Sequence, residues 1–167
     1  MTRAFAKAVA VVGLVLLTAC GAAPSSHTQP TPRPTATPLA VLASNYLSLV
    51  DPANRAYSDL ATALCFDGVA SCVSANMTTA QPLFRTYASA LTTLNEQLPS
   101  FQASLPATAQ ADLGQYRQAI ATEVADLGNV VQDTVEAQFW ADESRWAPET
   151  FRTGAADKLV RADLGNQ

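Results

Sequence analysis

Apolar side chains recur at steps of three and four through most of this chain, from Leu39 almost to its end. An α-helix completes one turn in about 3.6 residues, so this spacing places them along one face of a helix, and that face must be covered. Glycine is scarce, at 7 of 167 residues, which suits helices better than a β-sandwich. The pattern predicts a domain of amphipathic helices.

The first apolar stripe is interrupted at Asp51 and Pro52. Because proline lacks an N–H and clashes with the preceding turn, either the helix kinks there, or a short helix ends and Asp51 caps a second one. The stripe consists of Leu42, Tyr46, Leu49, Ala53, Tyr57, Leu60 and Leu64.

A second helix is predicted from about Thr79 to Leu98. Pro82 fits in its first turn, and Pro99 ends the helix or turns the chain. Its stripe consists of Ala80, Leu83, Tyr87, Leu91, Leu94 and Leu98, widened by Phe84.

The third stripe predicts the longest helix, and no proline or glycine after Gly128 stops it before Phe139 and Trp140. Pro148 then marks the start of a fourth, shorter helix that ends near Gly165. The third stripe consists of Leu113, Tyr116, Ile120, Val124, Leu127, Val131 and Val135, and the fourth of Phe151, Ala155, Leu159 and Ala162.

Four amphipathic helices cover one another's apolar faces most simply as an antiparallel bundle. We therefore expect an all-α fold, with one helical bundle domain over residues 39–167. This length suits a single domain with its own core, and two domains would be crowded.

The first 19 residues have the three parts of a secretory signal. Arg3 and Lys7 supply positive charge, an almost purely apolar run follows from Val9 to Leu17, and small residues precede Cys20. The run is shorter than the roughly 20 residues that a membrane-spanning helix needs. We expect this signal peptide to be removed.

The four residues Leu17, Thr18, Ala19 and Cys20, followed by Gly21, resemble the lipobox of bacterial lipoproteins. The resemblance implies cleavage before Cys20, attachment of diacylglycerol to its sulfur, and acylation of the new amino terminus, palmitate being a typical chain. Two or more acyl chains hold a protein stably at a membrane. We expect a protein anchored to the extracytoplasmic face of the cell membrane. The alternative is an ordinary secretory signal that contains a cysteine.

Residues 20–38 are rich in proline, threonine, serine and alanine, and they show no apolar pattern. Proline-rich chains favour an extended geometry of about 3.1 Å per residue, so this linker could hold the domain up to roughly 50 Å from the lipid. His27, the only histidine, falls in the linker, and we interpret it as solvated rather than metal-binding or catalytic.

Two cysteines, Cys65 and Cys72, flank a predicted turn after the first stripe. Exported proteins meet an oxidising environment, so we expect a disulfide between them. A structural zinc site usually needs four ligands, and a redox pair usually shows the Cys-x-x-Cys spacing that is absent here. Reactive thiols remain the alternative.

Catalytic motifs are absent from the predicted domain. Because it has no histidine, Ser-His-Asp, Cys-His and Glu-x-x-His sites are excluded, and it has no glycine-rich phosphate loop. Lys158 could activate a serine, but a solvated lysine on the last helix is the commoner case. We predict no catalytic residue, no metal ligand and no cofactor.

Six carboxylates lie along or just beyond the third stripe. Glu123 with Asp126, and Asp133 with Glu136, can share a helix face and could bind a hard cation or exchange a proton. We prefer a solvated helix face beside the apolar stripe. The six are Glu123, Asp126, Asp133, Glu136, Asp142 and Glu143.

Four aromatic residues lie near the junction of the last two predicted helices: Phe139, Trp140, Trp146 and Phe151. They could line a pocket for an apolar or sugar-like ligand. Aromatic residues at a helix junction are more often core, which is the interpretation we prefer.

Removal of the leader takes away Arg3 and Lys7 and leaves eight basic and 14 acidic residues, a formal charge of −6. This charge argues against nucleic acid as a partner and against electrostatic binding to anionic lipid. The sequence predicts a non-enzymatic envelope protein that binds a partner protein or a small ligand. The alternative is a carboxylate-based metal-binding protein or enzyme.

Overall fold

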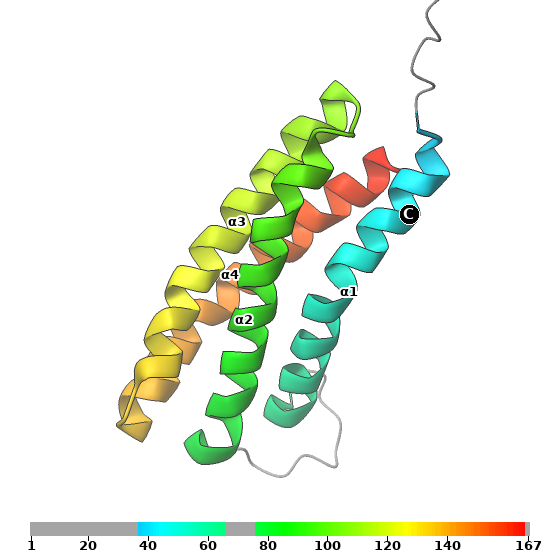
Figure 1. Ribbon diagram of the computed structural model, residues 1–167. Coiled ribbons are helices and arrows are strands. Elements are labelled where there is room, and N and C mark those ends of the chain that lie inside the picture. The colour runs from blue at the N-terminus through cyan, green and yellow to red at the C-terminus, as the bar shows by residue number, and fades with distance from the viewer. Residues whose placement is uncertain (1–36, 66–75, 166–167) are drawn as a thin grey trace, which may run out of the picture. The chain divides into compact units, whose positions relative to one another are not determined.

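The structure, a computed structural model, describes residues 37–65 and 76–165. In these two ranges the chain forms four α-helices and no β-strand: α1 (Leu39–Leu64), α2 (Met77–Gln102), α3 (Ala107–Gln132) and α4 (Glu136–Asp163). Successive helices run in opposite directions, and α4 passes behind α2 toward the start of α1 (Figure 1). The predicted all-α antiparallel four-helix bundle is confirmed.

Three prolines lie inside helices where the sequence suggested interruptions. Pro52, Pro99 and Pro148 are internal to α1, α2 and α4 respectively. A proline has no N–H, so the carbonyl four residues earlier in the helix loses its hydrogen-bond partner. All three prolines are exposed, so these carbonyls lie on the water-facing sides of their helices. The first stripe therefore belongs to one continuous helix. The helix end or turn predicted at Pro99 and the helix start predicted at Pro148 are wrong.

The end of α3 also differs from the prediction. The helix stops at Gln132 instead of continuing into Phe139, and Asp133 is extended. Gln81 Nε2 on α2 donates to the carbonyl oxygens of Val131, at 3.2 Å, and Asp133, at 2.7 Å. These bonds satisfy carbonyls that a helix end leaves free, and they come from a different helix.

The longest helix is α4, with 28 residues, so the expectation of a short fourth helix is wrong. Its predicted stripe is also out of phase, because Phe151 is 78 % exposed and Leu159 48 %. The face that is buried carries several polar residues, which a search for apolar spacing passes over. It consists of Phe139, Asp142, Trp146, Glu149, Thr153 and Val160.

Aromatic rings join α2 to α4 in the core. The ring of Phe84 lies 5.0 Å from that of Trp146 and 5.5 Å from that of Phe139, both edge to face. Such pairs add about 0.5 to 1.5 kcal/mol each to the burial of the rings themselves. The core interpretation of Phe139 and Trp146 is confirmed, since both are fully buried.

Most members of the first three predicted stripes are buried or packed against this core. Val135 is an exception, because it lies beyond the end of α3 and is exposed. Among the residues that the structure describes, none of the helices has both the length and the apolar character of a membrane span.

Candidate functional site

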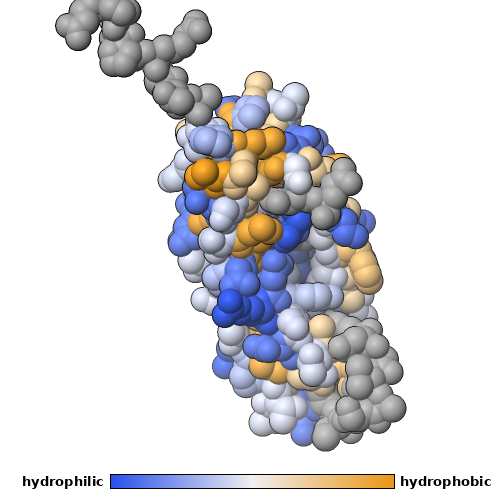
Figure 2. All heavy atoms as spheres, turned by 90° about the vertical axis from the view of Figure 1, so that its right-hand side faces the viewer, coloured by the Kyte–Doolittle hydropathy of each residue, from blue (hydrophilic) through white to orange (hydrophobic). Residues whose placement is uncertain are grey.

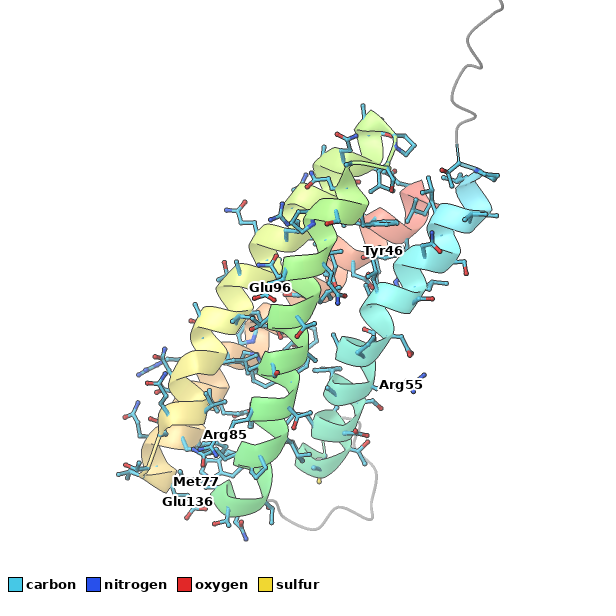
Figure 3. The ribbon with its side chains drawn as sticks, in the orientation of Figure 1. Tyr46, Arg55, Met77, Arg85, Glu96 and Glu136 are labelled. Atoms are coloured by element: carbon cyan, nitrogen blue, oxygen red, sulfur yellow. The ribbon has the colours of Figure 1, made fainter. Side chains whose placement is uncertain are left out.

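The first and last helices are joined by a partly buried polar contact. The Tyr46 hydroxyl on α1 donates to Asp157 Oδ1 on α4 at 2.5 Å, and Arg161 Nε donates to Asp157 Oδ2 at 2.6 Å. Tyr46 lies where α1 comes beside the end of α4 (Figure 3). Burial, with Tyr116 and the negative charge of Asp157, raises the pKa of Tyr46, so the hydroxyl stays protonated and remains a donor.

Beside this contact a groove of about 330 Å³ lies between α1 and α4, with α3 contributing to its floor. Its size falls at the lower end of the range for small-molecule sites, about 300 to 1,000 Å³. Five of the lining residues carry a hydroxyl or an amide. Three are aromatic, and two of these three are tyrosines already counted among the five. The lining residues are Asn54, Tyr57, Tyr116, Thr150, Phe151, Thr153, Gly154, Ala155, Asp157 and Lys158.

The charge in this groove is unlike that of the protein as a whole. Asp157 is its only carboxylate, and Arg161 and Tyr46 already engage both of the carboxylate oxygens. Lys158 is exposed and forms no salt bridge within the described ranges. An acidic protein thus presents an unneutralised cation at this groove.

The face that α1 presents to solvent is polar at mid-height and apolar toward the start of α1 (Figure 2). The apolar end includes the exposed residues Leu39, Val41 and Leu47. A separate depression there is lined largely by small and aliphatic side chains, among them Leu39, Ala43 and Leu47. The α1–α4 groove has more hydroxyl and amide side chains in its lining than this depression, and these groups can make directional hydrogen bonds.

A second polar centre lies inside the bundle at Glu123, which is fully buried. Its Oε1 accepts hydrogen bonds from the Tyr87 hydroxyl at 2.8 Å and from Trp146 Nε1 at 3.2 Å. Burial raises the pKa of Glu123, and the negative charge of Glu149 acts in the same direction. The hydrogen bonds from Tyr87 and Trp146 act in the opposite direction without outweighing burial.

The remaining atoms of this centre favour a neutral carboxyl group. Within the described part of the chain, neither Glu123 Oε2 nor Thr153 Oγ1 reaches hydrogen-bonding geometry with a partner. A carboxylate oxygen buried without a donor is costly, whereas a protonated Oε2 carries no charge. The raised pKa of Glu123 and its unpartnered Oε2 both favour the protonated acid, with Oε1 as the acceptor for two core donors.

The preferred interpretation of Glu123 as part of a solvated face is wrong. Position 123 lies three residues after Ile120 and four before Leu127, so it falls in the buried register of α3. The apolar pattern selected its neighbour Val124, which is only partly buried. The helical register could have indicated Glu123, but its residue type argued against burial.

The other carboxylates do not form the pairs that the alternative interpretation required. Asp126 is partly exposed while Glu123 is buried, and Asp133 lies beyond the end of α3. Desolvation raises the pKa of Asp133, and the nearby negative charge of Asp142 acts in the same direction. Asp142 is itself bonded to Arg145 Nη1 at 2.5 Å and to Gln138 Nε2 at 2.9 Å.

Glu136 is exposed, and Glu143 is partly exposed with its pKa raised by partial burial. The described residues include no group of three or more cysteine, histidine, aspartate or glutamate side chains placed to hold a metal ion.

Of the aromatic residues, Trp140 is partly buried and Phe151 lines the groove. The core interpretation is therefore wrong for Phe151. Of the predicted modification sites, Cys20 and Cys72 lie outside the described residues, as do the signal peptide and nearly all of the linker. Cys65 caps the end of α1 in a left-handed conformation, with φ 67°.

Comparisons of this chain with models of protein families, with curated proteins and with solved structures found no match. The geometry of the helical domain and the leader sequence therefore carry the information about function.

Proposed function

We propose that this chain is a lipid-anchored protein of the bacterial cell envelope whose helical domain binds a small ligand in the groove between α1 and α4. The anchor is Cys20, at the end of the lipobox-like segment, and the Pro-rich linker carries the domain on the extracytoplasmic side. A disulfide between Cys65 and Cys72 suits that oxidising location. The domain acts by binding rather than by catalysis.

The groove is the observation that supports ligand binding. Three helices build it, and the Tyr46–Asp157–Arg161 contact fixes two of these helices beside it. Preformed concave sites with a few placed polar groups are typical of small-molecule binding. Helices that are already held in place also lower the ordering cost of binding.

Gly154 provides the sharpest test of this proposal. It lines the groove, and a Cβ added there would meet no atom within 4 Å. Gly154→Phe should therefore fill the groove without a clash at the helix, and Gly154→Ala should leave the groove open. Both changes should keep or raise stability, because glycine is about 1 kcal/mol poorer than alanine within a helix.

The measurement is equilibrium dialysis of the full chain in detergent against the small-molecule fraction of a bacterial envelope extract. We expect a compound that is enriched by the native protein and by Gly154→Ala, but not by Gly154→Phe. Enrichment that is equal for all three proteins would reject the groove as the binding site. Equal helical circular dichroism of the native protein, Gly154→Ala and Gly154→Phe confirms that all three are folded.

A further inference from the structure

We propose that the groove between α1 and α4 recognises an acidic sugar, with the pyranose ring lying against Phe151 and the carboxylate paired with Lys158. This inference rests on the proposed binding function and names the chemical class of its ligand. It is carried by the arrangement of four residues along one face of α4, together with the polar groups opposite them.

Phe151 and Lys158 form the two ends of a shelf on α4. They are seven residues apart, so both lie on one helix face, separated by about 10 Å along the axis. Gly154 and Ala155 occupy the turn between them, and the lack of large side chains there leaves the helix surface open. A ligand on this shelf can reach from the aromatic ring to the ammonium group.

The aromatic end suits the apolar face of a sugar ring. Phe151 is 78 % exposed, although it stands on a helix whose other large aromatic rings are buried or partly buried. A phenyl ring lying open at a groove offers apolar area that a ligand can cover, and each Å² covered contributes about 25 cal/mol. Its six-membered outline matches the C–H face of a pyranose.

The cationic end selects an acid. Lys158 has no salt-bridge partner among the described residues, whereas Asp157 beside it is already engaged by Arg161 and Tyr46. A ligand carboxylate would therefore gain an ion pair, and a ligand ammonium would find no free carboxylate. The preference for an anion is local, since the mature chain as a whole is acidic.

The polar groups opposite the shelf favour a sugar over an aromatic acid. Asn54 and Tyr57 on α1 form no side-chain hydrogen bond with the described residues, and each can both donate and accept. Thr150 donates to the carbonyl of Ala147 at 2.8 Å, which leaves its oxygen free to accept. The hydroxyl groups around a pyranose ring would satisfy these groups, whereas an aromatic ring would leave them unpaired.

Two sugars that differ in one substituent provide the test: N-acetylmuramic acid, which carries a lactyl carboxylate, and N-acetylglucosamine, which lacks it. Binding to the full chain in detergent is measured by saturation-transfer NMR and titration. An exposed ion pair contributes at most about 1 kcal/mol, so we expect N-acetylmuramic acid to bind about threefold to fivefold more tightly.

Variants separate the two ends of the shelf. Lys158→Gln should lower the affinity for N-acetylmuramic acid to the level of N-acetylglucosamine. The affinity for N-acetylglucosamine should not change. Phe151→Ala should lower the affinity for both sugars about tenfold, which corresponds to a loss of 1.4 kcal/mol of contact. Arg55→Gln removes the same charge from a side chain that points from α1 into solvent (Figure 3), and Leu159→Ala trims an exposed apolar side chain outside the groove. Neither control should change binding.

Equal affinity for the two sugars would overturn the proposed acid selectivity and leave the groove as a sugar site. Failure of both sugars to bind would overturn the proposed ligand class, and the dialysis experiment with Gly154→Phe would then decide whether the groove binds anything. A loss of affinity with Arg55→Gln equal to that with Lys158→Gln would also reject the specific ion pair.

Discussion

The Tyr46 hydroxyl donates a hydrogen bond to Asp157 Oδ1 at 2.5 Å although the two residues are 111 positions apart in the chain. The bond joins α1 to α4 at the end of the bundle where the groove begins. Within the described ranges α1 packs mainly against α2, and α4 mainly against α3. This contact therefore has an unusually large part in setting the distance between the first and last helices.

Tyr46→Phe should lower the free energy of unfolding by about 1 to 2 kcal/mol, because the partly buried Asp157 oxygen loses its donor. Tyr57→Phe is the matched control, since the Tyr57 hydroxyl makes no hydrogen bond with the described residues, and it should cost less than about 0.5 kcal/mol. Urea unfolding followed by circular dichroism measures both. Equal midpoints for the two variants would contradict a structural role for the Tyr46–Asp157 bond.

Glu123→Gln should change how stability depends on pH. The pKa of Glu123 is raised from 4.5 by burial, so the folded protein retains a proton that the unfolded chain releases above that pH. The stability contributed by Glu123 is therefore complete below about pH 4.5 and is lost as pH rises toward the folded pKa. Glutamine carries no charge, so the variant should lack this decline.

Urea midpoints of the native protein and Glu123→Gln, measured from pH 4 to pH 8, check this expectation. The advantage of the glutamine variant should grow as pH increases. Glu96→Gln, on an exposed position of α2 (Figure 3), is the control and should run parallel to the native curve. A constant offset between Glu123→Gln and the native protein would show that Glu123 does not titrate differently on folding.

The sequence was sufficient to predict the helices wherever the buried face is apolar. The stripes through Leu60, Leu94 and Ile120 are correct because covering them dominates the packing. In α4 the buried face includes Asp142, Glu149 and Thr153, so the apolar pattern pointed to the opposite side and placed Phe151 in the core.

Contacts from distant segments account for the other differences. The end of α3 depends on Gln81, about 50 residues earlier in the chain, and no local signal encodes it. The groove requires α1, α3 and α4 to meet, so its residues could not be grouped from spacing along one helix. Burial of Glu123 likewise depends on donors from α2 and α4.

Leu127→Ala tests the predicted stripe of α3. Leu127 is fully buried, so removing its methyl groups should cost about 2 to 5 kcal/mol through lost burial and the cavity left behind. Gln118→Ala on the exposed side of the same helix should change stability by less than about 0.5 kcal/mol. Denaturant melts giving the same midpoint for both variants would contradict the packing of this helix.

Cys20→Ser tests the lipid anchor. The change removes the sulfur to which diacylglycerol would be attached, so the protein should leave the membrane fraction while its helical circular dichroism stays unchanged. Detergent phase partitioning of the native and variant proteins measures the difference. Cys65→Ser serves as a control, because it leaves Cys20 unchanged and should not alter partitioning. Retention of Cys20→Ser in the detergent phase would reject the proposed lipoprotein.

Cys65 and Cys72 should be bonded to each other in the mature protein. Closing so short a loop restricts the unfolded chain and stabilises the fold by roughly 2 to 3 kcal/mol on the chain-entropy account. Maleimide labelling of the unreduced, denatured chain, with mass spectrometry of the peptides, should find neither thiol free, and prior reduction should expose both. Cys65→Ser should then make Cys72 reactive and lower the unfolding midpoint. Labelling of both cysteines without reduction would show that the pair does not form, and the stability of the domain would then rest on the helical core alone.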